Sequence, residues 1–186
     1  MKTFSRVKIV TAGVVFLLYS VSTVLAQDSN SHSYRVHAGL GGSTFGLAAG
    51  LGTSFQIDDN LLSARFVYNE EPDLFTPTPR ENVWDVGVLY GRTLQLRRFS
   101  LSASGGISLV GGTKRGRHLG TKGEFFTTEV YESTSLSTVG FPIAAEVFVA
   151  PFSFFGVGIY GFANLNSTKS FAGVLLSIQI GNLRQE

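Results

Sequence analysis

The chain has 186 residues, of which 44% are hydrophobic, and it contains 22 glycines and no cysteine. The lack of cysteine excludes disulfide bonds and thiol chemistry. Three of the 15 basic residues, Lys2, Arg6 and Lys8, lie near the N-terminus, and the other 12 are balanced by 13 acidic residues. Most of the chain is therefore almost neutral, which argues against a nucleic-acid-binding protein.

The first 26 residues have the pattern of a secretory signal peptide. The three basic residues precede an apolar run at residues 9–18, and Val24, Leu25 and Ala26 fit a cleavage site before Gln27. This order of charge, apolar run and cleavage site is typical of exported proteins. The alternative is an uncleaved anchor helix over residues 9–26, because the run is close to the length that spans a membrane.

Eight strands are predicted after a short polar lead. In each strand, aliphatic or aromatic side chains alternate with glycine, serine or charged side chains, which is the period of a β-strand. The strands span residues 34–41, 44–57, 61–69, 82–96, 99–109, 136–150, 155–165 and 172–180. The last two form a hairpin around a polar turn that begins at Asn164, and arms of about ten residues can cross a bilayer when tilted.

The connections between the predicted strands differ in length. Those after the second, fourth and sixth strands are short, at residues 58–60, 97–98 and 151–153, whereas those after the third and fifth are long, at residues 70–81 and 111–135. The connections after the first and seventh strands are exceptions, because both are short. Brief turns at one end and larger loops at the other are typical of outer-membrane barrels.

This pattern of eight alternating strands behind a signal peptide resembles the small outer-membrane barrels of the OmpA and OmpX type. The resemblance implies an all-β fold, an eight-stranded antiparallel up-and-down transmembrane β-barrel over residues 34–181. Residues 1–26 would be the signal peptide, residues 27–33 a polar lead and residues 182–186 a polar tail. It also implies export to the bacterial outer membrane, contact with membrane lipid and folding by the outer-membrane assembly machinery. Barrels of this type usually end on an aromatic residue, whereas this chain continues through the polar tail.

In the predicted strands, large polar residues lie on the same face as the glycines and serines, and we call the residues of one face a parity. In an eight-stranded barrel this parity faces a lumen that side chains fill, so the small residues leave room for the large ones. Buried charges without partners cost on the order of several kcal/mol, so we expect an internal ion-pair network and no open pore. Its predicted members are Arg35, His37, Arg65, Asp85, Glu146 and Gln179.

Two further sets of residues point to the membrane surface. Basic residues in the longest loop suit the phosphates of lipopolysaccharide, although a solvated loop is the alternative interpretation. These residues are Lys114, Arg115, Arg117 and Lys122. Aromatic residues near the predicted strand ends suit the interfacial girdle of a membrane barrel. They are Tyr68, Trp84, Tyr90 and Tyr131.

No motif in the sequence indicates a cofactor or a metal. The G-x-G-x-x-G pattern at residues 156–161 lies inside a predicted strand, whereas a dinucleotide site needs it between a strand and a helix. His32 and His37 are five residues apart, so an extended strand places them on opposite faces. The leading hypothesis is a non-catalytic outer-membrane protein with a structural or surface-interaction role.

Two alternatives remain open at this point. A lipid-modifying barrel enzyme would use His37, Glu146 and a serine, but no spacing in the sequence supports that set. A soluble secreted barrel that binds a small hydrophobic ligand would have apolar residues inside and polar residues outside. Arg92 does not fit the membrane pattern, because it falls on the apolar parity; it either reaches the membrane surface or marks a bulge.

Overall fold

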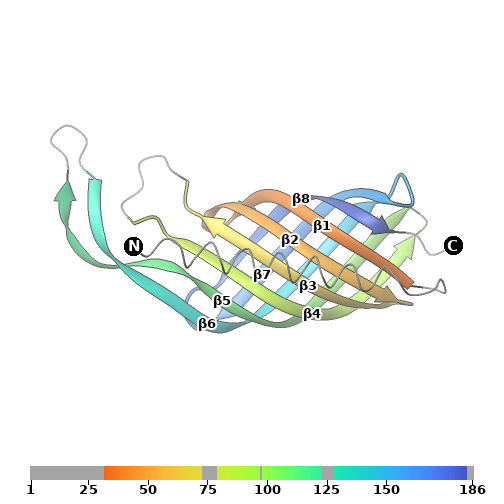
Figure 1. Ribbon diagram of the computed structural model, residues 1–186, viewed down its shortest axis with the longest axis horizontal. Coiled ribbons are helices and arrows are strands. Elements are labelled where there is room, and N and C mark those ends of the chain that lie inside the picture. The colour runs from red at the N-terminus through yellow and green to blue at the C-terminus, as the bar shows by residue number, and fades with distance from the viewer. Residues whose placement is uncertain (1–31, 73–78, 97, 123–127, 184–186) are drawn as a thin grey trace, which may run out of the picture.

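The computed structural model describes residues 32–72, 79–96, 98–122 and 128–183, and these form one closed barrel (Figure 1). Its strands are β1 (His32–Ser43), β2 (Gly46–Ile57), β3 (Asn60–Glu70), β4 (Asn82–Leu96), β5 (Phe99–Lys122), β6 (Thr128–Val149), β7 (Phe155–Asn166) and β8 (Phe171–Asn182). Each strand pairs antiparallel with the next, and β1 pairs antiparallel with β8 to close the barrel. The predicted eight-stranded up-and-down β-barrel is confirmed.

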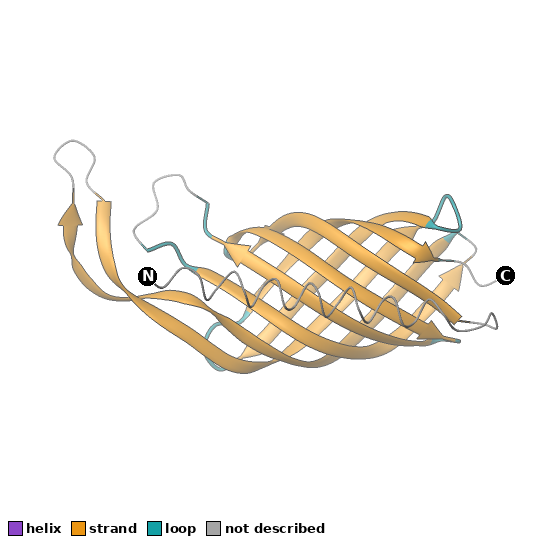
Figure 2. Cartoon of the chain, viewed as in Figure 1, coloured by secondary structure: helices purple, strands orange, loops and turns teal. Residues whose placement is uncertain are grey.

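The described residues consist of strands and the loops that join them (Figure 2). None of this part of the chain forms a helix that is long and apolar enough to cross a membrane. The predicted signal peptide and the alternative anchor helix lie outside the described residues, as do most of the polar lead and the last three residues of the predicted polar tail.

The two ends of the barrel differ. We call the end that carries the β2–β3, β4–β5 and β6–β7 connections, together with the start of β1 and the end of β8, the turn end. The opposite end, which carries the β1–β2, β3–β4, β5–β6 and β7–β8 connections, is the loop end. The turn end lies on the right of Figure 1 and the loop end on the left.

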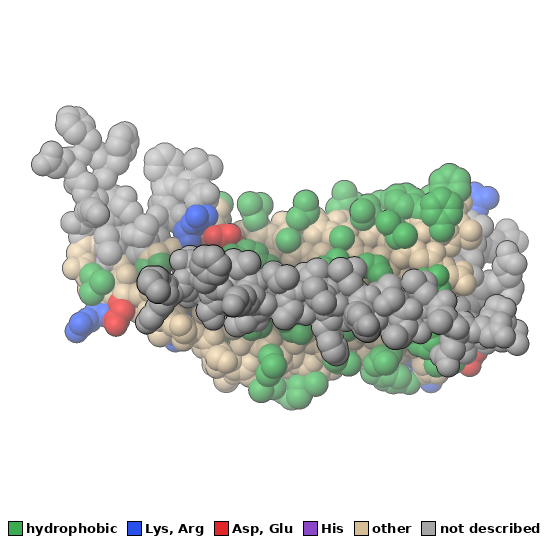
Figure 3. Space-filling view, viewed as in Figure 1, with side chains coloured by type: hydrophobic (Ala, Val, Ile, Leu, Met, Phe, Trp, Pro, Cys, Tyr) green, Lys and Arg blue, Asp and Glu red, His purple; other side chains and the backbone are tan. Residues whose placement is uncertain are grey.

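Side chains alternate strictly between the lumen and the outer wall. In β6, for example, Ala144, Glu146 and Phe148 are buried, whereas Ile143 and Val147 are exposed. The outer wall is formed mainly by large aliphatic and aromatic residues, and Figure 3 shows them along the length of the barrel. The opposite parity carries two arginine–carboxylate pairs into the interior, which is the reverse of a water-soluble barrel.

The largest difference from the sequence-based expectation is the hairpin of β5 and β6. Residues 111–135 were expected to form a long loop in which only residues 125–131 could extend the flanking strands, but β5 continues to Lys122 and β6 begins at Thr128. This expectation was wrong because the basic, glycine-containing run lacks apolar alternation. A hairpin that projects beyond the barrel has water on both faces, so it does not need that alternation. The projection is visible at the left of Figure 1.

The end of β8 and the position of Arg92 also bear on the sequence-based expectations. Asn182 and Leu183 were expected in the polar tail. In the structure, Asn182 is the last residue of β8, and Leu183 is buried against Phe148 and Ala150 at the turn end. Arg92 lies exposed on the outer wall opposite Asn60, and the pairing on both sides of β4 continues without a bulge. It therefore lies near the turn end, where its long side chain can reach the rim.

Candidate functional site

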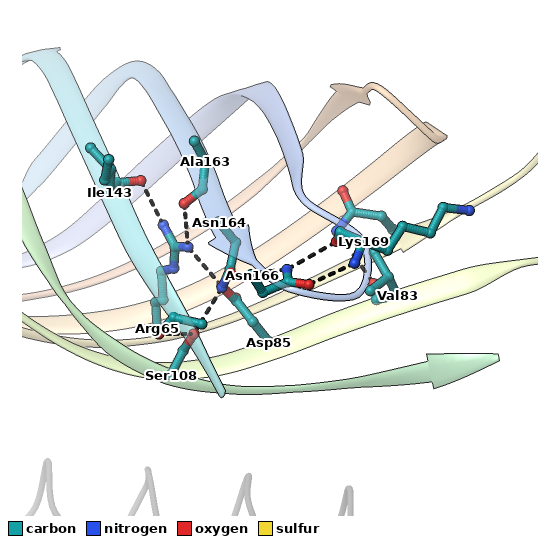
Figure 4. Close-up of polar contacts among 11 residues, drawn as sticks. Arg65, Val83, Asp85, Ser108, Ile143, Ala163, Asn164, Asn166 and Lys169 are labelled. Atoms are coloured by element: carbon teal, nitrogen blue, oxygen red, sulfur yellow. Dashed lines mark hydrogen bonds and ion pairs between the residues drawn. The ribbon is translucent and has the colours of Figure 1, made fainter. Parts of the chain in front are cut away.

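The first polar group in the lumen is centred on Arg65 of β3, which is 2% exposed. Its Nη2 atom lies 2.7 Å from Oδ2 of Asp85, on the neighbouring strand β4. The guanidinium also donates hydrogen bonds to the carbonyl oxygens of Ile143 and Ala163, each at 3.1 Å. Arg65 thus links β3 to β4, β6 and β7 across the barrel (Figure 4).

Asp85 accepts a second hydrogen bond, from Asn164 of β7. The Asn164 amide nitrogen lies 2.6 Å from Oδ2 of Asp85 and 2.8 Å from the hydroxyl oxygen of Ser108, as Figure 4 shows. The sequence placed Asn164 in a turn, but β7 continues to Asn166 and Asn164 is fully buried. The sequence did contain a signal for its burial, because Asn164 lies on the same face of the strand as Tyr160 and Phe162.

The second polar group is centred on Glu146 of β6. Its Oε2 atom lies 3.2 Å from Nη2 of Arg35, and its Oε1 atom accepts a hydrogen bond of 2.5 Å from Nε2 of Gln179. The Arg35 guanidinium carbon also lies 4.8 Å from the centre of the Phe148 ring. Because Arg35 is on β1 and Gln179 is on β8, Glu146 binds both strands that close the barrel.

His37, the remaining residue of the predicted set, makes a ring contact instead. Its ring lies 5.0 Å from that of Tyr160, and it occupies the space over Gly52, where a Cβ atom would lie 2.5 Å from the histidine Cε1. A glycine is therefore needed opposite this histidine. The structure thus divides the six predicted residues into two hydrogen-bonded groups and one histidine in a tilted ring contact.

A hydrophobic cluster shares the lumen with these polar groups. It includes buried aliphatic and aromatic side chains from every strand except β1, most of them nearer the loop end, among them Val67, Val83, Phe162, Phe171 and Leu175. The Phe171 ring makes edge contacts with Phe162 and with Phe45, at 6.3 and 6.4 Å between centres. The lumen is therefore filled by both polar and apolar side chains, which sequence parity alone did not indicate.

At the loop end, charged residues form ion pairs that join the β3–β4 and β7–β8 connections and β5. Arg115 pairs with Glu71, and its backbone nitrogen donates a hydrogen bond of 2.8 Å to Glu81. Lys169 pairs with Glu81, and its ammonium lies 4.0 Å from the centre of the Phe45 ring. We call these five residues the loop-end clasp.

The electrostatics of the clasp favour the ionised form of Glu81. Partial burial alone would raise its pKa, but the hydrogen bonds from Lys169 and from the Arg115 backbone, with both positive charges, lower the pKa below its ordinary value. The carboxylate therefore stays charged at neutral pH and holds the β3–β4 and β7–β8 connections to β5.

The comparisons with known proteins rest on structure, because no family model and no curated protein matches the sequence. Neisserial surface protein A has 9% sequence identity and a TM-score of 0.55, with 85% of this chain and 100% of that chain covered. The N-terminal β-barrel domain of Pseudomonas aeruginosa OprF has 13% identity and a TM-score of 0.55, with coverage of 80% and 96%. Ail, the attachment invasion locus protein of Yersinia pestis, has 12% identity and a TM-score of 0.52, with coverage of 81% and 97%. The chain has the fold of the small eight-stranded outer-membrane barrels.

The residues predicted to form an aromatic girdle lie at three places in the barrel. Tyr68 and Trp84 are cross-strand partners on the outer wall near the loop end, and Trp84 covers Gly111. Tyr90 is exposed near the turn end, where its hydroxyl donates a hydrogen bond of 2.6 Å to Asn60. Tyr131 lies in the projecting hairpin, where its ring contacts that of His118.

The predicted lipopolysaccharide contacts all lie on β5 beyond the barrel wall or at its edge. Arg117 is exposed and Lys114 is half-buried, while the Arg115 side chain is held in the loop-end clasp. Lys122 ends the strand, where only its backbone is described. The structure thus leaves Arg117 as the most accessible of the three cations whose side chains it describes.

The residues considered for an enzyme site surround one small cavity in the lumen. Its lining includes His37, Glu146, Tyr160 and the serines at positions 54, 63, 102 and 104, and its volume is about 10 Å³. Such a space holds about one water molecule, which is far too small for a lipid. Within the described residues, no cluster of His, Cys, Asp or Glu has the arrangement of a metal site.

Proposed function

We propose that this protein is an integral outer-membrane barrel that serves as a membrane anchor for a projecting hairpin with a surface-interaction role. The observation that carries the proposal is that the barrel has apolar side chains outside and charged side chains inside. Large apolar residues such as Leu40 and Leu176, 72% and 67% exposed, face outward, while two arginine–carboxylate pairs, Arg35–Glu146 and Arg65–Asp85, are buried in the lumen. In water such a wall would be a large exposed apolar surface, whereas in a bilayer it is the stable arrangement.

The orientation in the membrane follows from the connections. Outer-membrane barrels have short turns on the periplasmic side and larger loops outside. The turn end would therefore face the periplasm, and the loop end with the β5–β6 hairpin would face the cell exterior. The signal peptide at residues 1–26 would direct export through the secretory pathway, and the assembly machinery of the outer membrane would fold the barrel.

The projecting hairpin supports the surface role. β5 pairs with β4 only as far as Thr113, and β6 pairs with β7 only from Gly140 onward. Beyond these points the two strands pair with each other, so that each presents an outer edge. Strand edges of this kind bind other extended chains through backbone hydrogen bonds.

Lipopolysaccharide is the ligand that we propose for the base of the hairpin. Arg117 and Lys114 lie where the outer leaflet would end, and charged side chains of this type bind phosphate groups through strong hydrogen bonds. Ail, one of the similar structures, has been solved in complex with the heparin analogue sucrose octasulfate, which is also a polyanion. This supports an anionic ligand for this barrel as well.

The two alternative functions are weaker. A lipid-modifying enzyme needs a catalytic group that an acyl chain or a headgroup can reach, but His37 and Glu146 are 4% exposed and line a cavity of about 10 Å³. A soluble barrel that binds a hydrophobic ligand needs a polar outer wall, and here the outer wall is aliphatic. Both therefore conflict with the geometry.

The membrane location predicts that a charge on the outer wall is unfavourable. Ile107 is 61% exposed in the middle of the paired part of β5. The Ile107→Arg variant is expected to lose about 2–4 kcal/mol of unfolding free energy in lipid vesicles, because an arginine at the bilayer midplane is costly. Urea unfolding measures this loss, and fractionation of expressing cells shows whether the protein is in the outer membrane.

A matched control separates lipid exposure from a general effect of arginine. The Ser137→Arg variant places the same charge on the outer-wall parity of β6, where this strand leaves the barrel at the loop end, and it should lose less than about 1 kcal/mol, since the cost falls near the interface. Equal losses at both positions, or a protein that stays in solution without detergent, would show that the wall does not face lipid.

The lipopolysaccharide proposal predicts a loss of affinity when the exposed cations are removed. The Lys114→Ala, Arg117→Ala double variant is expected to bind lipopolysaccharide about tenfold or more weakly, because each charge-assisted hydrogen bond contributes about 1.5–3 kcal/mol. Calorimetric titration of the detergent-solubilised barrel measures the affinity. The Arg92→Ala variant removes an exposed arginine at the turn end and should keep the original affinity; unchanged binding by the double variant would contradict the proposal.

A further inference from the structure

The β6–β7 turn carries two exposed phenylalanines beyond the ends of the strands. Phe152 and Phe154 are 58% and 62% exposed, and their rings stack with 5.8 Å between centres and 19° between planes. Pro151 and Ser153, which flank Phe152, are exposed as well. A turn in contact with water usually carries polar residues, so a stacked pair of exposed aromatic rings indicates a different neighbour.

Backbone hydrogen bonds hold this turn in place. The carbonyl oxygens of Ser153 and Phe154 accept hydrogen bonds from the backbone nitrogens of Leu183 and Gly181, at 2.8 and 3.1 Å. The backbone nitrogen of Ala150 donates a hydrogen bond of 2.8 Å to the carbonyl oxygen of Arg98, in the adjacent β4–β5 turn. The two rings are therefore presented by a fixed backbone.

The phenylalanine pair continues the apolar outer wall. Leu96 pairs with Phe99, and Phe99 pairs with Val149, which gives a row of exposed apolar residues around the turn end from β4 to β6. Hydrophobic side chains also gather near the turn end in Figure 3. The β6–β7 turn extends this row beyond the strands.

The opposite side of the same rim is polar. There the outer wall ends at Ile57, and the β2–β3 turn carries Asp58 and Asp59, both exposed. The apolar surface is thus taller on the β5–β7 side of the barrel than on the β2–β3 side. A membrane barrel with such a difference buries its taller side more deeply.

We propose that the Phe152–Phe154 pair inserts into the periplasm-facing leaflet, at the boundary between lipid headgroups and acyl chains. This inference rests on the membrane location proposed above. Aromatic side chains are enriched at this boundary, and Arg98, exposed in the adjoining turn, suits the phosphate of a phospholipid headgroup. The turn therefore anchors one side of the barrel rim to the leaflet.

Tryptophan fluorescence with brominated lipids tests the depth of the turn. The chain contains a single tryptophan, so the Trp84→Phe variant gives a background without this signal. On that background, Phe154→Trp places one reporter in the turn, Phe141→Trp places one on the outer wall and Asp59→Trp places one in the polar β2–β3 turn. Each variant is folded into phosphatidylcholine vesicles, and a heat-modifiable gel shift confirms folding.

The three positions have different expected results. Phe154→Trp should emit at shorter wavelength than tryptophan in water and be quenched more by bromines near the headgroup than by bromines near the chain ends, since interfacial side chains lie about 5–10 Å deep. Phe141→Trp should be quenched by lipid bromines, and Asp59→Trp should be quenched by aqueous acrylamide.

Two other outcomes would each overturn a different statement. If Phe154→Trp emits as in water and is quenched by acrylamide, while Phe141→Trp is quenched by lipid bromines, then the turn does not insert although the barrel is in the membrane. If lipid bromines quench neither reporter, the proposed membrane location itself is wrong.

Discussion

Replacing Asp85 with alanine is expected to lower the unfolding free energy by about 3–5 kcal/mol, because the buried Arg65 guanidinium would lose its only ion-pair partner among the described residues. The carbonyl oxygens of Ile143 and Ala163 would still accept hydrogen bonds from it, but they cannot neutralise its charge. Urea unfolding of the protein in lipid vesicles measures the loss, and Trp84, the neighbour of Asp85, supplies the fluorescence signal.

Two further variants show whether the uncompensated charge causes this loss. The Arg65→Met, Asp85→Leu double variant removes both charges, so it should recover most of the lost stability. The Glu70→Gln variant weakens the Arg80–Glu70 pair, whose side chains are 43% and 33% exposed, and it should cost less than about 1 kcal/mol. A similar small loss for Asp85→Ala would contradict the importance assigned to the lumenal pair.

Replacing Phe162 with alanine should have an effect of similar size for a different reason. Phe162 is 4% exposed, and its ring packs against the Phe171 ring and over Gly173. Its removal leaves a cavity in a packed interior, and such Phe→Ala changes cost about 3–5 kcal/mol. The same urea unfolding experiment measures it.

The control for this prediction lies on the outer wall. Phe141 is 66% exposed on β6, so the Phe141→Ala variant removes the same atoms without creating a buried cavity. Its loss of stability should be clearly smaller. Equal losses for the two variants would mean that Phe162 is not part of a packed lumen.

The number and facing of the strands could be predicted because each face of a membrane strand meets one environment. One face of each strand is mainly aliphatic, the other carries the glycines, serines and buried charges, and a shift of one residue would exchange the two faces. The same reasoning assigned Arg35, Arg65 and Glu146 to the lumen, and in the structure all three are buried.

The partners within the lumen could not be predicted in this way. Parity states which wall a side chain faces, but the pairing of Glu146 with Arg35, 111 residues away, depends on how the closed barrel brings distant strands together. Asn164 was missed because an asparagine near a polar turn is usually part of the turn. The projecting hairpin was missed because its strands extend beyond the barrel, where they have neither a lumen face nor an outer-wall face to produce the alternation.

The position of Glu146 has a consequence for the alignment in which the barrel closes. Its two carboxylate oxygens contact the first and the last strand, so an open sheet in which these strands have not yet met leaves the carboxylate without either partner. The backbone ladder alone could close in a shifted alignment, but only the alignment that pairs His37 with Gln179 brings both contacts to one side chain. A barrel closed in a shifted alignment is therefore expected to leave this buried charge without one of its partners, which disfavours that alignment.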